Sequence, residues 1–259
     1  MATIATIPQR RKLVGSFYVT MAAIFAAIAF SGFFMTYWLQ VARGTFTGSP
    51  MLHLHGLLFS LWTLFFLSQA VLMANGNRRN HRKWGLLGIS LATAMLFTGL
   101  AVAIQGLQAR LDAGYGDAAR AFSIVPITGI LLFAGLVTAA ISNLKRPEWH
   151  KRLMLVATAG ILQAAVARFF FLAATGGGGP GMRPGIGPPN AVENTMVAGV
   201  IVASLVVAAM IHDWRSYGRV HPAYWWGFGA MVTVHLLRPL LDQTEAWYAI
   251  ADFLVRFGG

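Results

Sequence analysis

The 259-residue sequence contains no cysteine, which excludes disulfide bonds, thiolate metal sites and cysteine nucleophiles. Acidic residues are scarce as well: 8 Asp and Glu stand against 20 Lys and Arg, for a formal net charge of +12. Only 11% of the residues are charged, whereas 57% are hydrophobic. This balance excludes a water-soluble domain and predicts an integral protein that crosses a membrane several times.

Lysine is missing from every long apolar run, because the four lysines are Lys12, Lys83, Lys145 and Lys151. A retinal Schiff base, which needs a lysine inside the bundle, is therefore excluded. Histidines and carboxylates are too few and too scattered for a di-iron hydroxylase. The sequence also has neither a phosphate-binding loop nor a nucleophile elbow, the signatures of nucleotide hydrolysis and of serine hydrolases.

Seven apolar runs are long enough to cross about 30 Å of hydrocarbon as helices. They extend over Ser16 to Gln40, Met51 to Ala74, Gly85 to Leu107, Ala121 to Asn143, Leu153 to Thr175, Thr195 to Asp213 and Tyr224 to Leu241. After them, residues 245–259 alternate apolar and polar side chains at helical spacing, which predicts a short interfacial helix. The predicted fold is all-α: one integral membrane domain, residues 1–259, built as a polytopic bundle of seven transmembrane helices.

Basic residues are distributed unequally between the segments that join these spans. The N-terminus and the segments 75–84, 144–152 and 214–223 hold 13 basic residues, whereas the opposite side holds five. The positive-inside rule therefore predicts a cytoplasmic N-terminus and an external C-terminus. Residues 175–194, rich in glycine and proline, become a flexible outer loop. Because the charge sits in short loops, it predicts contact with lipid phosphates and no nucleic-acid binding.

The third and fifth predicted spans begin with similar segments, NHRKWG and EWHKRL. Each segment has a histidine followed by two basic residues at the point where a helix leaves the cytoplasmic face. Such flanks commonly set topology by contacting lipid phosphates. The alternative is an inner anion or cofactor site formed by His81, Arg82, His150, Lys151 and Arg152.

A histidine at the head of the second span is followed by Gln69 and by an RxxHRxxG element that contains His81. This order resembles a bacterial family of predicted integral membrane proteins of unknown function. Its members also carry a second histidine-basic-basic element with an arginine 18 residues later, where this chain has His150 and Arg168. The resemblance covers mainly residues 51–175. This chain departs from the family pattern around the second element, where it has LML in place of the usual tryptophan and arginine. It implies a multi-pass protein of the bacterial cytoplasmic (inner) membrane, but no reaction.

Five ionisable side chains fall in the outer half of the predicted bundle: His53, His55, Arg168, His235 and Arg238. Asp242 lies one turn after Arg238 and is expected to pair with it. Arg168 then has no carboxylate partner, and an unpaired charge in hydrocarbon costs about 2.5 to 3.5 kcal/mol. The simpler interpretation is that both arginines reach the outer headgroups and that the histidines lie at the interface. The other is that this layer binds an anionic group from outside the chain.

Two functions fit such a layer. The first is a b-type haem for electron transfer near the outer face, with His53 or His55 and His235 as axial ligands and the arginines on the propionates. The second is a non-catalytic membrane subunit or carrier that binds a lipid, a quinone or a small molecule. Copper or zinc on the three histidines is a weaker option. Gln69 is a further candidate for the cofactor site, although an interhelical hydrogen bond explains it more simply.

The composition and the candidate site also indicate which partners to expect. Membrane lipids are expected in every case, together with a quinone or redox partner at the outer face. A place in a larger membrane complex fits the subunit hypothesis.

Overall fold

The protein is described by a computed structural model that covers residues 7–175 and 187–258. The described residues are mostly helical and include no β-strand, which confirms the all-α prediction. The main helices are α1 (Ile7–Phe33), α3 (Pro50–Ala74), α4 (Arg78–Asp112), α5 (Gly116–Ser142), α6 (Pro147–Ile161), α7 (Gln163–Thr175), α8 (Thr195–Tyr217), α9 (Pro222–Leu241) and α10 (Glu245–Gly258). Short elements are η1 (Phe34–Trp38), α2 (Leu39–Ala42) and η2 (Val192–Asn194).

Six helical segments among the described residues are long and apolar enough to cross a membrane, which indicates a multi-pass membrane protein. They are Ser16–Ala42, Pro50–Ala74, Arg78–Asp112, Gly116–Ser142, Pro147–Ala173 and Val192–Tyr217. The seventh predicted span forms α9, which is less apolar than these six segments. Tyr224, Trp225 and Trp226 lie near its start, and His235 and Arg238 lie further along it. A count of seven spans therefore stays a prediction.

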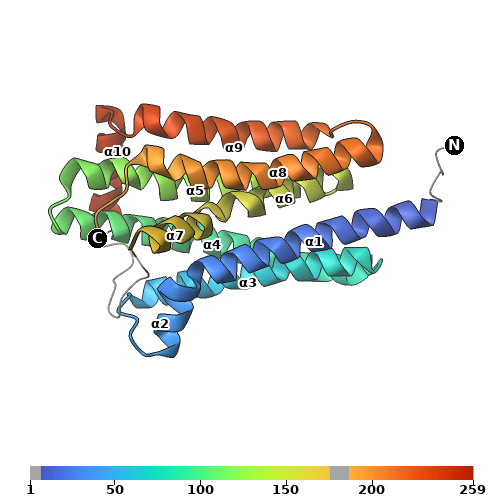
Figure 1. The fold of residues 1–259 in the computed structure, drawn as a ribbon, viewed down its shortest axis with the longest axis horizontal. Helices are drawn as coiled ribbons and strands as arrows, with labels where there is room; N and C mark the ends of the chain where they lie inside the picture. The colour runs from blue at the N-terminus through green and yellow to red at the C-terminus, as the bar shows by residue number, and fades with distance from the viewer. Residues whose placement is uncertain (1–6, 176–186, 259) are drawn as a thin grey trace.

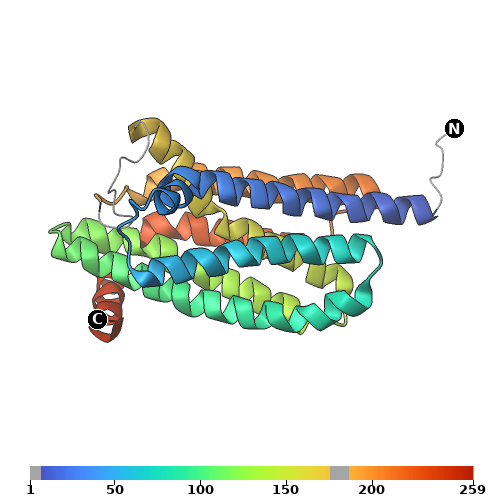
Figure 2. The same ribbon diagram turned by 90° about the horizontal axis from the view of Figure 1, so that it is seen from below.

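The helices run up and down the long axis of one bundle. In Figure 1, α8 and α9 lie along one edge, α1 and α3 lie along the opposite edge, and α4 to α7 fill the space between them. The loops at residues 75–77, 143–146 and 218–221 meet at the end nearer the N-terminus, and we call this the basic end. Helix α10 crosses the other end, over α4 and α5, as Figure 2 also shows.

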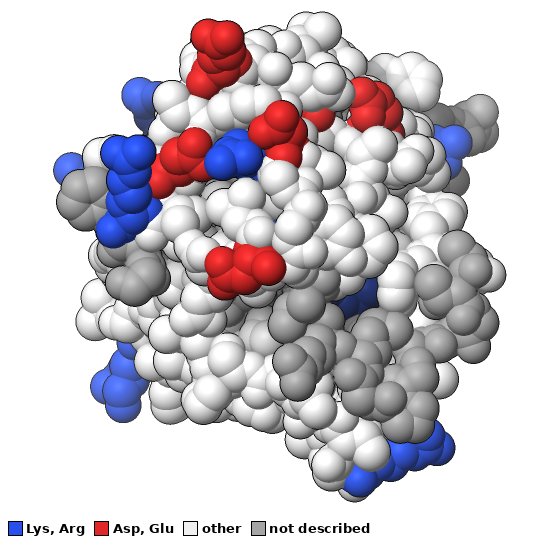
Figure 3. Space-filling view, turned by 90° about the vertical axis from the view of Figure 1, so that its left-hand side faces the viewer, with Lys and Arg blue, Asp and Glu red and all other residues white. Residues whose placement is uncertain are grey.

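The end that carries α10 holds six of the eight acidic residues, so we call it the acidic end. They are Asp112, Asp117, Glu193, Asp242, Glu245 and Asp252. Figure 3 looks onto this end and shows the acidic side chains gathered over part of it. Most of the predicted flexible outer loop, residues 176–186, lies outside the described residues.

Local signals in the sequence explain where several helices begin and end. The Asn77 side chain accepts a hydrogen bond from the backbone N–H of Asn80 (3.2 Å) and caps α4. Proline opens α3, α6 and α9, at a position where its missing N–H has no helical partner to lose. Gly218 ends α8 with φ of 72°, a left-handed conformation that suits glycine.

Two irregularities interrupt the predicted spans. The first span passes through one turn of π-helix at Phe34–Trp38, and the fifth is divided into α6 and α7 at Leu162. Gln163, the first residue of α7, turns its amide away from the helix and donates to the carbonyl of Thr195 (3.0 Å). Both irregularities lie in the half of the bundle toward the acidic end, and both adjoin buried polar side chains.

The core is apolar along most of its length and is centred on Trp62 of α3. The Trp62 indole meets Phe133 edge to face at 5.0 Å and donates from Nε1 to the hydroxyl of Thr158 (3.3 Å). Near the acidic end, α1 approaches α7 closely: a Cβ on Gly32 would lie only 2.4 Å from the carbonyl oxygen of Ala165. Glycine at position 32 therefore permits the contact between these two helices.

Candidate functional site

Arg238 is one of the most deeply buried charged residues, with 2% of its surface exposed. Its guanidinium donates to the Thr128 hydroxyl (2.8 Å), to the Gln163 amide oxygen (2.8 Å) and to the carbonyl of Val125 (3.1 Å). The predicted ion pair with Asp242 is wrong, because no ion pair joins these two described residues. Neutral acceptors on α5 and at the α6–α7 break surround the charge instead.

His235 lies one turn before Arg238 and faces α8. A Cβ on Gly199 would lie 2.8 Å from its Nδ1 and 3.5 Å from the amide nitrogen of Gln163. The imidazole therefore occupies the space that glycine leaves open. His235, Gln163 and Arg238 form one group between α6, α7, α8 and α9.

His55 and Arg168 form a second group, between α1, α3 and α7. The His55 ring lies 4.1 Å from the ring of Phe59, and its buried Nδ1 meets no hydrogen-bond partner in the part of the chain that is described. The Arg168 guanidinium lies 4.0 Å from the centre of the Phe33 ring and donates to the carbonyl of Ala164 (2.9 Å). Its positive charge acts on the His55 imidazole.

Two polar residues that sequence reasoning missed, Thr36 and Gln40, follow Phe33 by three and seven positions, and the Phe33 ring meets Arg168. Thr36 is 5% exposed and Gln40 is 4% exposed, yet the hydroxyl and both amide atoms find no hydrogen-bond partner among the described residues. Thr36 belongs to the π-helical turn, which packs on the start of α3 through Tyr37 and Gly56. A threonine and a glutamine four residues apart in an apolar span are the only signal in the sequence. Turns of π-helix are frequent at functional sites.

His53 points away from His55, as its helical position predicts, and is exposed. It shares a hydrogen bond of 3.1 Å with the Tyr37 hydroxyl and packs edge-on against Phe46. His55 and His235 belong to helices at opposite edges of the bundle (Figure 1). Among the described residues, no group of three or more histidine, aspartate or glutamate side chains is arranged to hold a metal ion.

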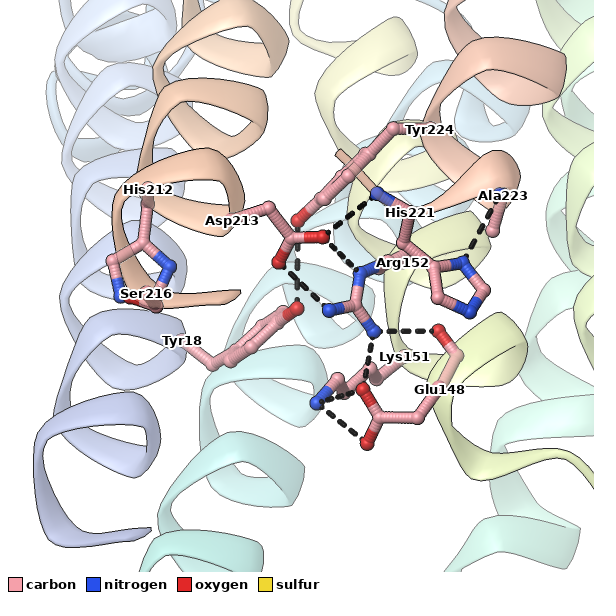
Figure 4. Close-up of polar contacts among 10 residues, drawn as sticks. All are labelled: Tyr18, Glu148, Lys151, Arg152, His212, Asp213, Ser216, His221, Ala223 and Tyr224. Carbon is pink, nitrogen blue, oxygen red and sulfur yellow. Dashed lines mark hydrogen bonds and ion pairs between the residues drawn. The ribbon is translucent and has the colours of Figure 1, made fainter. Parts of the chain in front are cut away.

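At the basic end the dominant feature is Arg152, also 2% exposed. It makes a bidentate pair with Asp213: Nε lies 2.9 Å from one carboxylate oxygen and Nη2 lies 2.7 Å from the other. Its Nη1 donates to the carbonyl of Glu148 (2.9 Å) and to the Glu148 side chain. Figure 4 shows that every guanidinium nitrogen is engaged.

The Arg152–Asp213 pair also fixes the loop between α8 and α9. Asp213 accepts from the backbone N–H of His221 (3.1 Å), and the His221 Nδ1 in turn accepts from Ala223 and caps α9 (Figure 4). Burial lowers the pKa of His221, and the positive charge of Arg152 lowers it further. The neutral imidazole with a bare Nδ1 is therefore the form that fits this cap.

The predicted inner site of His81, Arg82, His150, Lys151 and Arg152 is divided by these contacts. Arg152 and Lys151 are both engaged by Glu148, and Arg152 also by Asp213. His81 and His150 come together, with ring centres 6.3 Å apart, whereas Arg82 is exposed. Asp213 was missed from the sequence, although an acid in the last turns of an apolar span was a usable signal.

Asp242 is a buried acid at the acidic end. It is 2% exposed, and one of its carboxylate oxygens has no hydrogen-bond partner in the described chain. Burial raises the pKa of this carboxyl, and the nearby charge of Glu193 raises it further.

Comparison with known proteins gives no further guide to these sites, since no protein-family model, curated protein sequence or solved structure matches the chain.

Proposed function

We propose that the protein is a non-catalytic membrane subunit or carrier that binds the headgroup of a quinone in the layer formed by Thr36, Gln40, His55 and Arg168. The observation that supports this function is the set of buried polar atoms without partners in that layer. Leaving a buried donor or acceptor unpaired costs about 1 to 3 kcal/mol. Several such atoms, one of them on the His55 imidazole that the Arg168 charge acts on, are the arrangement of a site that a ligand completes.

The chemistry of the layer matches a quinone. The two ring carbonyls of a quinone accept hydrogen bonds, and Arg168, the amide of Gln40 and the hydroxyl of Thr36 are donors. Exposed apolar side chains adjoin the layer, including Phe34 and Leu57, each 52% exposed. They offer a surface along which an isoprenoid tail can lie in the hydrocarbon.

We also propose seven spans, with α9 as the last. Its 20 residues reach about 30 Å as a helix, it runs alongside α8 and α6, and its polar residue Arg238 is buried. Trp225 and Trp226 are exposed near its start, where an aromatic belt is expected. The basic end then faces the bacterial cytoplasm, and the quinone layer faces out. Reporter fusions at Asn77 and at Gly259 should give opposite orientations; equal orientations would remove one span.

Quinone binding is tested by titrating the purified protein with a short-tailed ubiquinone and following tryptophan fluorescence. Saturable binding is expected, and Arg168→Gln or Gln40→Met should raise the Kd at least about tenfold, the equivalent of one lost hydrogen bond to a charged or buried group. Gln105→Met is the matched control, because Gln105 is exposed at the same end. Unsaturable binding, or an equal loss in the control, would contradict the proposal.

The haem function inferred from the sequence stays a prediction, and the same purified sample tests it. A reducible Soret band that disappears in His235→Ala would establish haem ligation by that histidine. A protein without such a band, purified from cells well supplied with haem, would leave the quinone-binding proposal as the function of the layer.

A further inference from the structure

Gln69 of α3 is a buried glutamine whose side chain has nothing to bind. It is 9% exposed, and neither its amide oxygen nor its amide nitrogen has a hydrogen-bond partner in the described residues. The predicted interhelical hydrogen bond is thus not made by the side chain. A side-chain amide has two N–H donors and a carbonyl acceptor, so a ligand that satisfies it must both accept and donate a hydrogen bond.

The position of Gln69 along the bundle follows from its neighbours. Trp62 bonds to Thr158 of α6, and Gln69 lies seven residues further along the same face of α3. Seven residues are about 10 Å of helix. Helices α3 and α6 run in opposite directions (Figure 1), so the same distance toward the basic end takes α6 from Thr158 back to His150 and Lys151. Gln69 therefore lies at the level of His150.

Two histidines, His81 and His150, lie at this level. Nδ1 of His150 donates to the carbonyl of Ala140 (3.0 Å), which leaves Nε2 for a ligand. The backbone carbonyl of Gln69 lies close to the His81 imidazole, and the buried Nδ1 of His81 has no partner among the described groups. The ring centres are 6.3 Å apart and the ring planes meet at 75°, so the two imidazoles lie edge to face.

Charge decides whether a metal ion or an anion would bind beside these two imidazoles. His81 and His150 each lie in the first turns of a helix, α4 and α6, whose N-terminus carries a partial positive charge. The first turn of α4 holds no acid, and the charge of Arg82 acts on the His81 imidazole. Glu148, the acid in the first turn of α6, is already paired with Lys151 and Arg152. Positive charge therefore predominates around the two imidazoles, which repels a metal cation and attracts an anion.

We propose that Gln69, His81 and His150 bind a phosphate monoester at the basic end of the bundle. The phosphate oxygens accept from the Gln69 amide N–H, and the P–OH group donates to the amide oxygen or to a bare imidazole nitrogen. A fully deprotonated anion such as sulfate has no hydrogen to donate and leaves those acceptors unpaired. Phosphate diesters, which have no P–OH group left once they are ionised, are disfavoured for the same reason. This site is separate from the quinone layer, and its test does not depend on quinone binding.

The test is calorimetric titration of the full-length protein in detergent at about pH 6, close to the second pKa of a phosphate monoester, where the P–OH form is well populated. Inorganic phosphate and short-chain phosphatidic acid should bind at least about tenfold more tightly than sulfate and short-chain phosphatidylglycerol, respectively. Tighter binding of phosphatidic acid than of inorganic phosphate would identify a lipid headgroup as the source. Equal binding would identify a soluble phosphate ester.

Two variants locate the site, and a third is the control. Gln69→Leu and His81→Phe should weaken phosphate binding at least about tenfold, whereas Arg79→Gln, an exposed residue at the same end, should change it less than about threefold. Gln69→Leu removes an unpaired buried amide, so it is expected to fold. Equal affinity for sulfate and phosphate, no saturable binding of either probe, or an equal loss in Arg79→Gln would overturn the proposal.

Discussion

The Arg152–Asp213 pair gives the sharpest prediction about stability. Both side chains are 2% exposed, so Asp213→Asn leaves a buried guanidinium whose remaining acid, Glu148, is 51% exposed. Removing one partner of a buried ion pair costs about 3 to 5 kcal/mol, because the other charge stays buried without compensation. We therefore expect the free energy of unfolding, measured by titrating SDS into mixed micelles, to fall by about this amount.

The double variant Arg152→Met with Asp213→Leu separates this reasoning from a general loss of packing. Replacing both charges with apolar groups removes the desolvation cost as well as the attraction, so the double variant should lose less stability than either single variant. Glu148→Gln is the matched control and should cost less than about 1 kcal/mol, because half of that side chain is in contact with solvent. A cost below about 1 kcal/mol for Asp213→Asn, or additive losses in the double variant, would refute the reasoning.

Three further outcomes follow from the geometry. Gln69→Leu should raise the free energy of unfolding by about 1 to 2 kcal/mol in the absence of phosphate, because it removes an unpaired buried amide. Gln163→Leu removes two hydrogen bonds, to Arg238 and Thr195, and should lower the free energy of unfolding by more than that. Thermal unfolding in detergent compares the two variants. Gly32→Ala should destabilise the protein by about 1 to 3 kcal/mol, because the new Cβ meets the Ala165 carbonyl. Gly135→Ala adds a Cβ in open space on a helix and should be neutral or stabilising. The thermal unfolding midpoint should therefore fall for the first variant and stay or rise for the second. Because the pKa of His221 is lowered in the folded protein, its contribution to the free energy of unfolding is fully present above the unfolded pKa of about 6.5 and is lost as pH falls through the folded pKa. His221→Asn keeps a capping side chain and should flatten the pH dependence of the free energy of unfolding in that window.

Part of each candidate site could be read from the sequence. His55 and Arg168 were identified because a charge or imidazole inside an apolar run needs a partner. The likeness of the two histidine-basic segments suggested an inner site that includes His81 and His150, and the centres of these two rings lie 6.3 Å apart. Thr36 and Gln40 could not be identified in this way, because one threonine or one amide in an apolar helix usually bonds within its own or a neighbouring helix.

The sequence also placed Arg152 in an anion site and Arg238 in a pair with Asp242, and the contacts are different. Arg152 and Lys83 occupy equivalent positions in the two similar segments, but Arg152 is buried and Lys83 is exposed. Nothing in either segment encodes this difference. It comes from Asp213, 61 residues away on α8, which offers the bidentate acceptor that a buried guanidinium requires.

By itself the sequence determined that the described chain is helical and where α3 and α9 begin and end to within two residues, because apolar length and local caps act within a few residues. Helix α4, in contrast, begins seven residues before the predicted third span. Only the tertiary structure decided which buried polar atoms are satisfied. Arg238 finds its acceptors 75, 110 and 113 residues away, and no periodic pattern along the chain carries that information. The physical reason is that a hydrogen bond depends on distances of about 3 Å between side chains of different helices, and packing alone sets those distances.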